Sequence, residues 1–254
     1  MATRPPDAPD AVWHVTSRVN WQAWHLDTAE AYDLFLRLLG HALHTNSVDL
    51  LGCVVMSNHY HAVLRSPGVE RFKELTGRPM RCRHFRPWPY GHPQATVIGQ
   101  CVREFKLSVS KALQDEMGLT GHFWQGRHDR RRLWDEWALV VALAYDHRNP
   151  VRAGMAARPE DYPRSSARWW STGEPFALPL ACRPDFALGC EREAFRTRLL
   201  RFQRERRLDD VMKALFKLRR SIDSAAGRWY LEQLLLEAGL DPLSCGTRAA
   251  LRRA

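Results

Sequence analysis

The pattern of apolar and polar positions divides the first 150 residues into strands and helices. The strand-like segments, which alternate or form short apolar runs, are residues 11–18, 48–55, 59–65 and 122–133. The helix-like segments, with apolar positions three and four apart, are residues 30–43, 96–117 and 136–148. This order predicts an α+β fold, a ferredoxin-like β-α-β-β-α-β palm with an antiparallel sheet and one added helix.

Local signals set the expected boundaries of these elements. Asp27-x-x-Glu30 resembles a capping box and predicts the start of the first helix. Asn149-Pro150 predicts the end of the 136–148 helix, because a residue before proline avoids the helical region. Residues 66–95 are rich in proline and glycine, which predicts a loop or an irregular insertion.

The second part of the chain is less regular. We expect a first domain at residues 1–170, a Pro-rich linker at 171–190 that wraps on this domain, and a basic helical C-terminal extension at 191–254. The extension could hold duplex DNA through phosphates or pack on the palm as a bundle. A helix-turn-helix at about 208–240 lacks a clear turn.

Composition restricts the class of partner. The 254 residues carry 38 Lys and Arg against 28 Asp and Glu, a formal charge of +10, which favours a polyanion such as nucleic acid. The beginning of the chain shows no apolar stretch typical of a signal peptide, and no apolar run approaches the roughly 20 residues of a membrane helix. Six cysteines without a CxxC pair are typical of reduced thiols, so we expect a cytoplasmic protein without a membrane partner.

The triplet His59-Tyr60-His61 stands out among the candidate functional residues. On a strand, residues i and i+2 point to the same face, so both imidazoles can ligate one divalent cation while Tyr60 points into the packing layer. The simpler alternative is a buried pair of imidazoles without a metal.

Tyr145 and Asn149 lie four residues apart on the apolar helix and therefore share one of its faces. Tyrosine is a weak nucleophile at its ordinary pKa near 10, and a cation that polarises the attacked phosphate removes this handicap. The alternative is a core tyrosine with a hydrogen-bonded hydroxyl.

Four motifs together resemble the REP-associated tyrosine transposases, bacterial single-tyrosine transposases with a His-hydrophobe-His motif. They are HVTSRVN, VVMSNHYHAVLRSP, GHFWQGRHDRR and AYDHRNPVRAGMAARPEDYPRSS, in this order within residues 11–170. This resemblance implies that His59, His61 and Asn149 hold Mg²⁺ or Mn²⁺ and that Tyr145 is the nucleophile. The sequence departs from the family pattern at Tyr60, where an aliphatic residue or methionine is more frequent, and at Val19, where glycine is frequent.

The resemblance also implies a DNA partner, single-stranded or folded into hairpins such as REP-like palindromes. We expect a monomer or homodimer. The expected DNA-binding residues are Arg18, Lys106, Trp124, Gln125, Arg127, Arg130, Arg131, Arg132 and Arg152. Arginines interleaved with aromatic residues suit a single strand with stacked bases, although a solvated edge strand would have the same composition.

Two alternative functions remain open at this stage. One is a nucleic-acid-binding protein without catalysis, and the other is a metal-dependent nuclease in which water attacks the phosphate. We expect His147, two residues from Tyr145, on an exposed face of the helix. The spacing of Cys82, His84, His92 and Cys101 matches no common zinc finger, so we expect no zinc site there.

Overall fold

The computed structural model describes residues 8–80, 96–133, 136–181, 192–204 and 233. Four strands form one sheet: β1 (Val12–Arg18), β2 (Asp49–Met56), β3 (His59–Arg65) and β4 (Asp129–Leu133). The helices are α1 (Ala29–Thr45), α2 (Val69–Thr76), α3 (Val97–Met117), α4 (Glu136–Arg152), α5 (Ala167–Thr172) and α6 (Arg192–Arg204), with short 3₁₀ turns η1 (Asn20–Gln22) and η2 (Pro159–Asp161). Of these helices, none is both long enough and apolar enough to span a membrane.

The sheet has the order β2-β3-β1-β4, and every neighbouring pair is antiparallel. With α1 after β1 and α3 after β3, this confirms the predicted α+β, ferredoxin-like arrangement. β1 and β3 occupy the centre, and their register pairs Thr16 with His61 and Arg18 with His59. The histidine strand is therefore covered on both edges by other strands.

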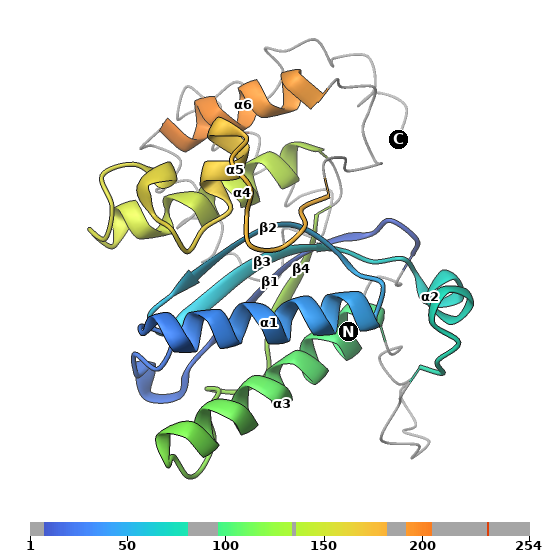
Figure 1. Cartoon of the computed structure of the whole chain (residues 1–254). Helices are drawn as coiled ribbons and strands as arrows, with labels where there is room; N and C mark the ends of the chain where they lie inside the picture. Colours follow the sequence, from blue (N-terminus) through green and yellow to red (C-terminus); the bar gives the residue numbers. More distant parts are fainter. Residues whose placement is uncertain (1–7, 81–95, 134–135, 182–191, 205–232, 234–254) are drawn as a thin grey trace.

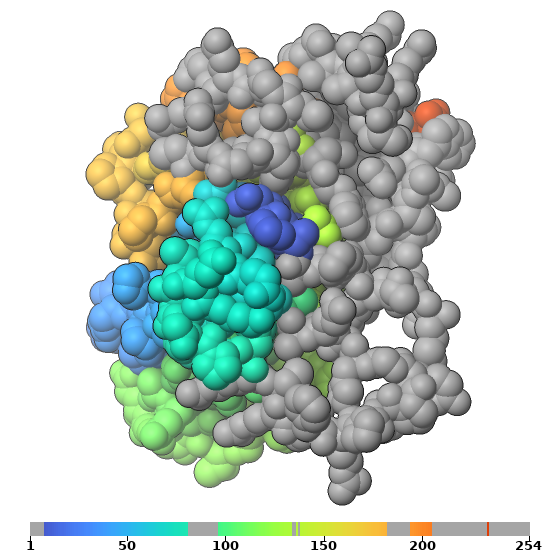
Figure 2. Space-filling model, turned by 90° about the vertical axis from the view of Figure 1, so that its right-hand side faces the viewer, coloured from blue at the N-terminus to red at the C-terminus, as the bar shows by residue number. Residues whose placement is uncertain are grey.

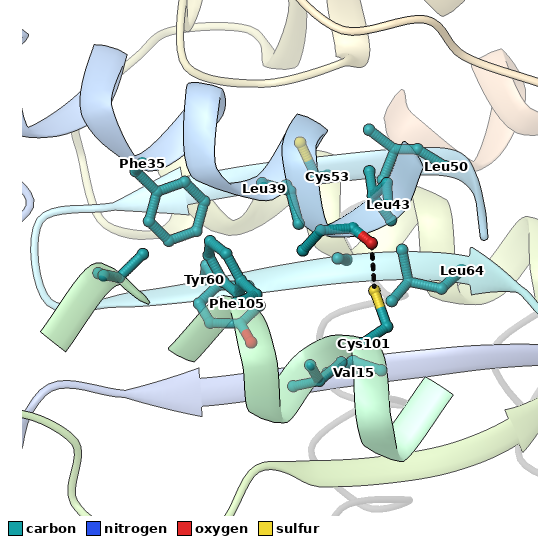
Figure 3. Close-up of a cluster of buried hydrophobic side chains, with 14 of the residues drawn as sticks. Val15, Phe35, Leu39, Leu43, Leu50, Cys53, Tyr60, Leu64, Cys101 and Phe105 are labelled. Carbon is teal, nitrogen blue, oxygen red and sulfur yellow. Dashed lines mark hydrogen bonds between the residues drawn. The ribbon is translucent and has the colours of Figure 1, made fainter. Parts of the chain in front are cut away.

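Helices α1 and α3 cover one face of the sheet, as Figure 1 shows below the strands. Tyr60 points into this layer, where its ring makes edge contacts with Phe35 and Phe105 (Figure 3). This confirms that Tyr60 lies on the opposite face from the histidines. The predicted cap of α1 was displaced by one residue, since the Thr28 hydroxyl accepts from Ala31 N while Asp27 accepts from the Ser57 hydroxyl.

Helix α4 covers the opposite face of the sheet (Figure 1). It packs so closely on β2 that a Cβ added to Gly52 would lie 2.5 Å from the Leu143 side chain. Its other side is covered by α6, whose Phe195, Leu199 and Phe202 are buried in the same cluster. This double cover accounts for the burial of residues 139–144 on an apolar helix.

Two predicted boundaries were wrong. α4 continues through Pro150 to Arg152, because a proline near the end of a helix removes only one backbone hydrogen bond. The insertion at 66–95 is not wholly irregular, since it contains α2, which carries the buried Phe72. Figure 2 shows α2 (cyan) beside the first described residues (dark blue). Near this contact, Asp10 N donates to Ser66 O.

The chain after α4 returns along the outer edge of β2. Val55 N donates to Arg164 O, and Ala181 N donates to Leu50 O, so this segment is wrapped on the palm. The division into residues 1–170, 171–190 and 191–254 stays a prediction. The segment 208–240, considered for a helix-turn-helix, and the residues Cys82, His84 and His92 lie outside the described residues.

Candidate active site and metal centre

The site is formed where β1 and β3 carry polar residues toward α4. On β1, one face of the strand carries His14, Thr16 and Arg18, and the residues between them lie on the opposite face. On β3, the site face carries His59 and His61. Helix α4 adds Tyr145, Asn149 and Arg152 from above this face. A cavity of about 580 Å³ brings these elements together; its lining is Thr16, Arg18, Met56, His59, His61, Asp129, Arg131, Tyr145, Asn149, Arg152 and Ala153.

All four residues expected in the reaction centre therefore meet in one cavity. The rings of His59 and His61 have centroids 5.2 Å apart, and the ring of His61 lies 5.9 Å from that of Tyr145. Tyr145 and Asn149 are both buried. The predicted constellation is assembled by the fold, while the role of each residue remains a proposal.

Each of the two histidines has its Nδ1 atom next to a side-chain oxygen. His59 Nδ1 lies 2.7 Å from Asn58 Oδ1, and His61 Nδ1 lies 3.3 Å from Asp146 Oδ1. A histidine that donates Nδ1–H to an oxygen presents the lone pair of Nε2, which is the usual arrangement around metal ions. For His59 this arrangement presents the Nε2 lone pair to a cation, whereas His61 Nδ1 also lies 3.3 Å from His14 Nε2.

Both histidines are also kept neutral. Burial lowers the pKa of His59 to about 4, with a further contribution from Arg18 and Arg152. Burial lowers the pKa of His61 well below its ordinary value, and neighbouring His14 and His59 add to this effect. Neutral imidazole is the form that binds metal, so the site is ready for a cation at neutral pH.

Sequence reasoning missed His14 and Asp146, which lie directly behind His61. Asp146 Oδ1 is 2.9 Å from His14 Nε2, and all three side chains are buried. The donor atoms of His14, His61 and Asp146 lie within 4.8 Å of one another, so this cluster could itself hold a metal ion. The sequence does contain a signal for this cluster. Asp146 directly follows the apolar segment ALVVALAY, and a carboxylate buried there needs polar partners.

One further observation indicates that these residues fit a divalent cation. Among the residues that the structure describes, Asn149 Nδ2 and Asp146 Oδ2 are buried and have no hydrogen-bond partner. A half-turn of the Asn149 carboxamide presents its oxygen instead, a ligand that Mg²⁺ and Mn²⁺ accept. Asn149 lines the cavity of Tyr145, so a cation bound there would satisfy its carboxamide.

Arg152 is the charged neighbour of Tyr145. Its guanidinium carbon lies 4.6 Å from the centroid of the Tyr145 ring, and its side chain reaches the same cavity. Arg18 approaches from β1. Two guanidinium groups beside a phenol form a site that suits a phosphate.

The remaining basic candidates divide between the two faces of β4. Asp129 and Arg131 lie toward the site, whereas Arg130 is stacked on Trp13 in the opposite layer. Arg132 pairs with Trp13 in the register and shares the face of Arg130. The structure therefore does not bring the four arginines of residues 127–132 together on one surface.

Trp124 and Lys106 are held in the core. The Trp124 indole is buried and donates to Lys106 O, so it offers no open face to a base in this conformation. The Lys106 ammonium donates to Gly126 O, and burial lowers its pKa to about 8. By contrast, Gln125 and Arg127 are exposed beside His59 and Arg18 in an adjoining hollow.

The expectation that His147 is exposed was wrong. His147 is fully buried, and its ring bonds to Ser166 Oγ at 2.9 Å and to the Gln203 amide of α6. The reason is that His147 lies between β2 and α6, with its Nε2 near Gly52 and its two ring nitrogens bonded to Ser166 and Gln203. His147 joins three elements and makes no contribution to the cavity around Tyr145.

Two solved structures are similar to the chain. One, described as a REP-associated tyrosine transposase bound to a REP hairpin, is 18% identical, with 75% of this chain and 98% of that chain covered and a TM-score of 0.47. The other, from Deinococcus radiodurans and described as a candidate transposase, is 13% identical, with 61% and 92% covered and a TM-score of 0.34. No protein-family model and no curated protein matches the chain.

Proposed function

We propose that this protein is a metal-dependent transposase that cuts and rejoins single-stranded DNA through Tyr145. The observation that carries the proposal is the common cavity of His59, His61, Tyr145 and Asn149, which come from β3 and α4. A phenol beside neutral imidazoles and arginines is a suitable arrangement for covalent attack on a phosphodiester. The motifs of the sequence give the same assignment by resemblance.

We assign the divalent cation, Mg²⁺ or Mn²⁺, to His59, His61 and Asn149. When bound, it supplies Lewis-acid polarisation of the scissile phosphate and neutralises charge that develops there, an effect of several kcal/mol. Asn58 and Asp146 hold the two imidazoles through their Nδ1 atoms. They act as positioning residues, because they contact the ligands and not the substrate.

The chemistry then belongs to Tyr145. Its hydroxyl loses a proton and attacks phosphorus in line, and the bond from phosphorus to the 3′ oxygen breaks. The 3′ oxygen takes up a proton and leaves as a free 3′-OH, while the 5′-phosphate stays on the tyrosine. Attack by a 3′-OH on this ester rejoins a strand without ATP, since the energy of the bond is conserved.

Arg152 and Arg18 are proposed to position the phosphate. Arg152 contacts the Tyr145 ring and Arg18 lies opposite His59, so a phosphate between them would lie next to the nucleophile. Fixing two reacting groups in this way contributes to rate through orientation. The exposed Gln125 and Arg127 continue this basic surface away from the cavity.

The proposal is tested by incubating the protein with labelled single strands that carry hairpins from its own genomic flanks, with Mn²⁺ or with chelator. We expect a protein–DNA adduct that resists denaturation, only in the presence of the cation. Cleavage without an adduct would favour attack by water, and binding without cleavage would favour a protein that has lost catalysis.

A further inference from the structure

Two tryptophans project into solvent from the connection between β1 and α1. Trp21 is 90% exposed and Trp24 is 71% exposed, more than any other large apolar side chain in the described ranges. We call residues 20–25 the tryptophan loop. Tryptophan is usually buried over most of its large surface, so two exposed indoles in six residues require an explanation other than packing.

The backbone of the loop has a defined, hydrogen-bonded conformation. Trp21 and Gln22 both have a φ of 55°, a left-handed backbone that bulky residues rarely adopt. The turn is closed by Gln22 N donating to Val19 O and by Ala23 N donating to Asn20 O. Such strain persists only where the surroundings enforce it, and it is concentrated at functional sites.

One side chain connects this loop to the candidate metal centre. The Asn58 amide nitrogen donates to Gln22 O at 3.2 Å, while its Oδ1 lies 2.7 Å from His59 Nδ1. The loop therefore lies at the end of the sheet where the β2–β3 turn leads into His59, as Figure 1 shows for the blue segment between β1 and α1.

A series of adjoining hollows leads from the loop to Tyr145. The hollow at Asn20 contains Gln125, Gly126 and Arg127. The next hollow shares these three residues and adds Arg18, His59 and His61. The cavity of Tyr145 and Asn149 shares Arg18 and both histidines with it. The three hollows thus connect Asn20 of the tryptophan loop to the proposed nucleophile.

We propose that the tryptophan loop is a stacking platform for the bases of a single-stranded nucleic acid whose backbone follows this surface to Tyr145. Arg127, Arg18 and Arg152 would meet successive phosphates, and Trp21 and Trp24 would stack on unpaired bases beyond them. A duplex hides the faces of its bases, so the platform favours single strands. This inference deepens the proposed function and rests on it for the direction of the strand.

The test measures binding without catalysis. Protein with Tyr145→Phe in excess chelator is titrated into a fluorescein-labelled thymidine oligonucleotide, and its anisotropy gives the Kd. We expect Trp21→Ala and Trp24→Ala each to weaken binding roughly 5- to 150-fold, the range of one base stacked on an aromatic ring. Trp21→Phe should restore most of the affinity. Leu75→Ala, which removes an exposed apolar side chain on α2, is the control and should leave the Kd unchanged.

An abasic strand of the same length separates stacking from charge. It should bind the unsubstituted loop and the alanine variants equally, because it offers phosphates without bases. Equal losses on the abasic strand, or an unchanged Kd for both alanine variants, would overturn the proposal. It would also be overturned if the variants lost binding to anionic phospholipid vesicles while they kept their affinity for the oligonucleotide. None of these results depends on whether Tyr145 forms a covalent bond.

Discussion

His61 Nδ1 lies 3.3 Å from Asp146 Oδ1, in the interior between β3 and α4. The same oxygen lies 2.9 Å from His14 Nε2, so one carboxylate oxygen serves two imidazoles. His61 Nδ1 also lies 3.3 Å from His14 Nε2, so His14, His61 and Asp146 form one buried network. When His61 Nδ1 carries a proton in this network, its Nε2 presents a lone pair to a ligand. The helix that carries Tyr145 therefore also contacts a proposed metal ligand through Asp146.

Asp146→Asn should weaken Mn²⁺ binding by roughly 10- to 100-fold, the usual effect of removing a carboxylate behind a metal-bound histidine. Isothermal titration with Mn²⁺ measures it. Glu136→Gln is the matched control, because Glu136 is a buried acid on the same helix that pairs with Arg198 instead. An unchanged Mn²⁺ affinity in Asp146→Asn would remove the positioning role.

Two single substitutions decide which side chains hold the cation. If the cation binds at His59, His61 and Asn149, His59→Ala should abolish measurable cation binding. His14→Gln should then weaken cation binding only indirectly, because His14 contacts the ligand His61 and not the cation. The opposite order would place the cation in the cluster of His14, His61 and Asp146. Binding of single-stranded DNA should be retained in both variants, since phosphate contacts rest on arginines.

Tyr60→Phe should leave activity intact and leave the free energy of unfolding unchanged or raised by up to about 1 kcal/mol. The Tyr60 hydroxyl is buried and has no hydrogen-bond partner in the described part of the chain, so its removal relieves a desolvation cost. Tyr162→Phe is the contrasting control. Its hydroxyl donates to Val55 O at 2.9 Å, and its loss should cost about 0.5–1.5 kcal/mol in urea unfolding. A clear destabilisation by Tyr60→Phe would show that the hydroxyl has a partner.

The buried His147 should make stability depend on pH. Burial lowers its pKa to about 3, whereas the unfolded chain takes up a proton near pH 6.5. The folded state therefore binds fewer protons between these values, and the free energy of unfolding falls as the pH is lowered through this range. For one histidine the loss between pH 7 and pH 5 is about 2 kcal/mol.

His147→Gln should remove that part of the pH dependence. Urea unfolding of the wild type and the variant at pH 7 and pH 5, in chelator, gives the difference. The two proteins should approach each other in stability as the pH falls. Parallel losses in both would contradict a neutral, buried His147.

The palm and the pairing of the histidines were predictable because they depend on local patterns. A period of two puts His59 and His61 on one face and Tyr60 on the other, and this alternation survives in the folded sheet. The burial of His147 was not predictable in this way. It depends on α6, which is distant in sequence, covering a face of α4 that has no apolar signal at positions 147 and 148.

The same limit applies to the basic residues. The run Arg130, Arg131 and Arg132 appears as one cluster in the sequence, but strand alternation sends Arg130 to Trp13 and Arg131 to the site. His14 and Asp146 were missed since their contact joins residues more than a hundred positions apart. Composition identifies a buried charge, but only the folded chain identifies its partner.

The measurement that tests the central claim most directly is the location of the covalent bond. The adduct formed with Mn²⁺ is digested with protease and nuclease, and mass spectrometry identifies the peptide that retains a 5′-nucleotide. We predict a nucleotide on Tyr145 and no adduct in Tyr145→Phe, which should keep its fold and its affinity for DNA. A nucleotide on any other residue, or an adduct that persists in Tyr145→Phe, would contradict the proposed mechanism.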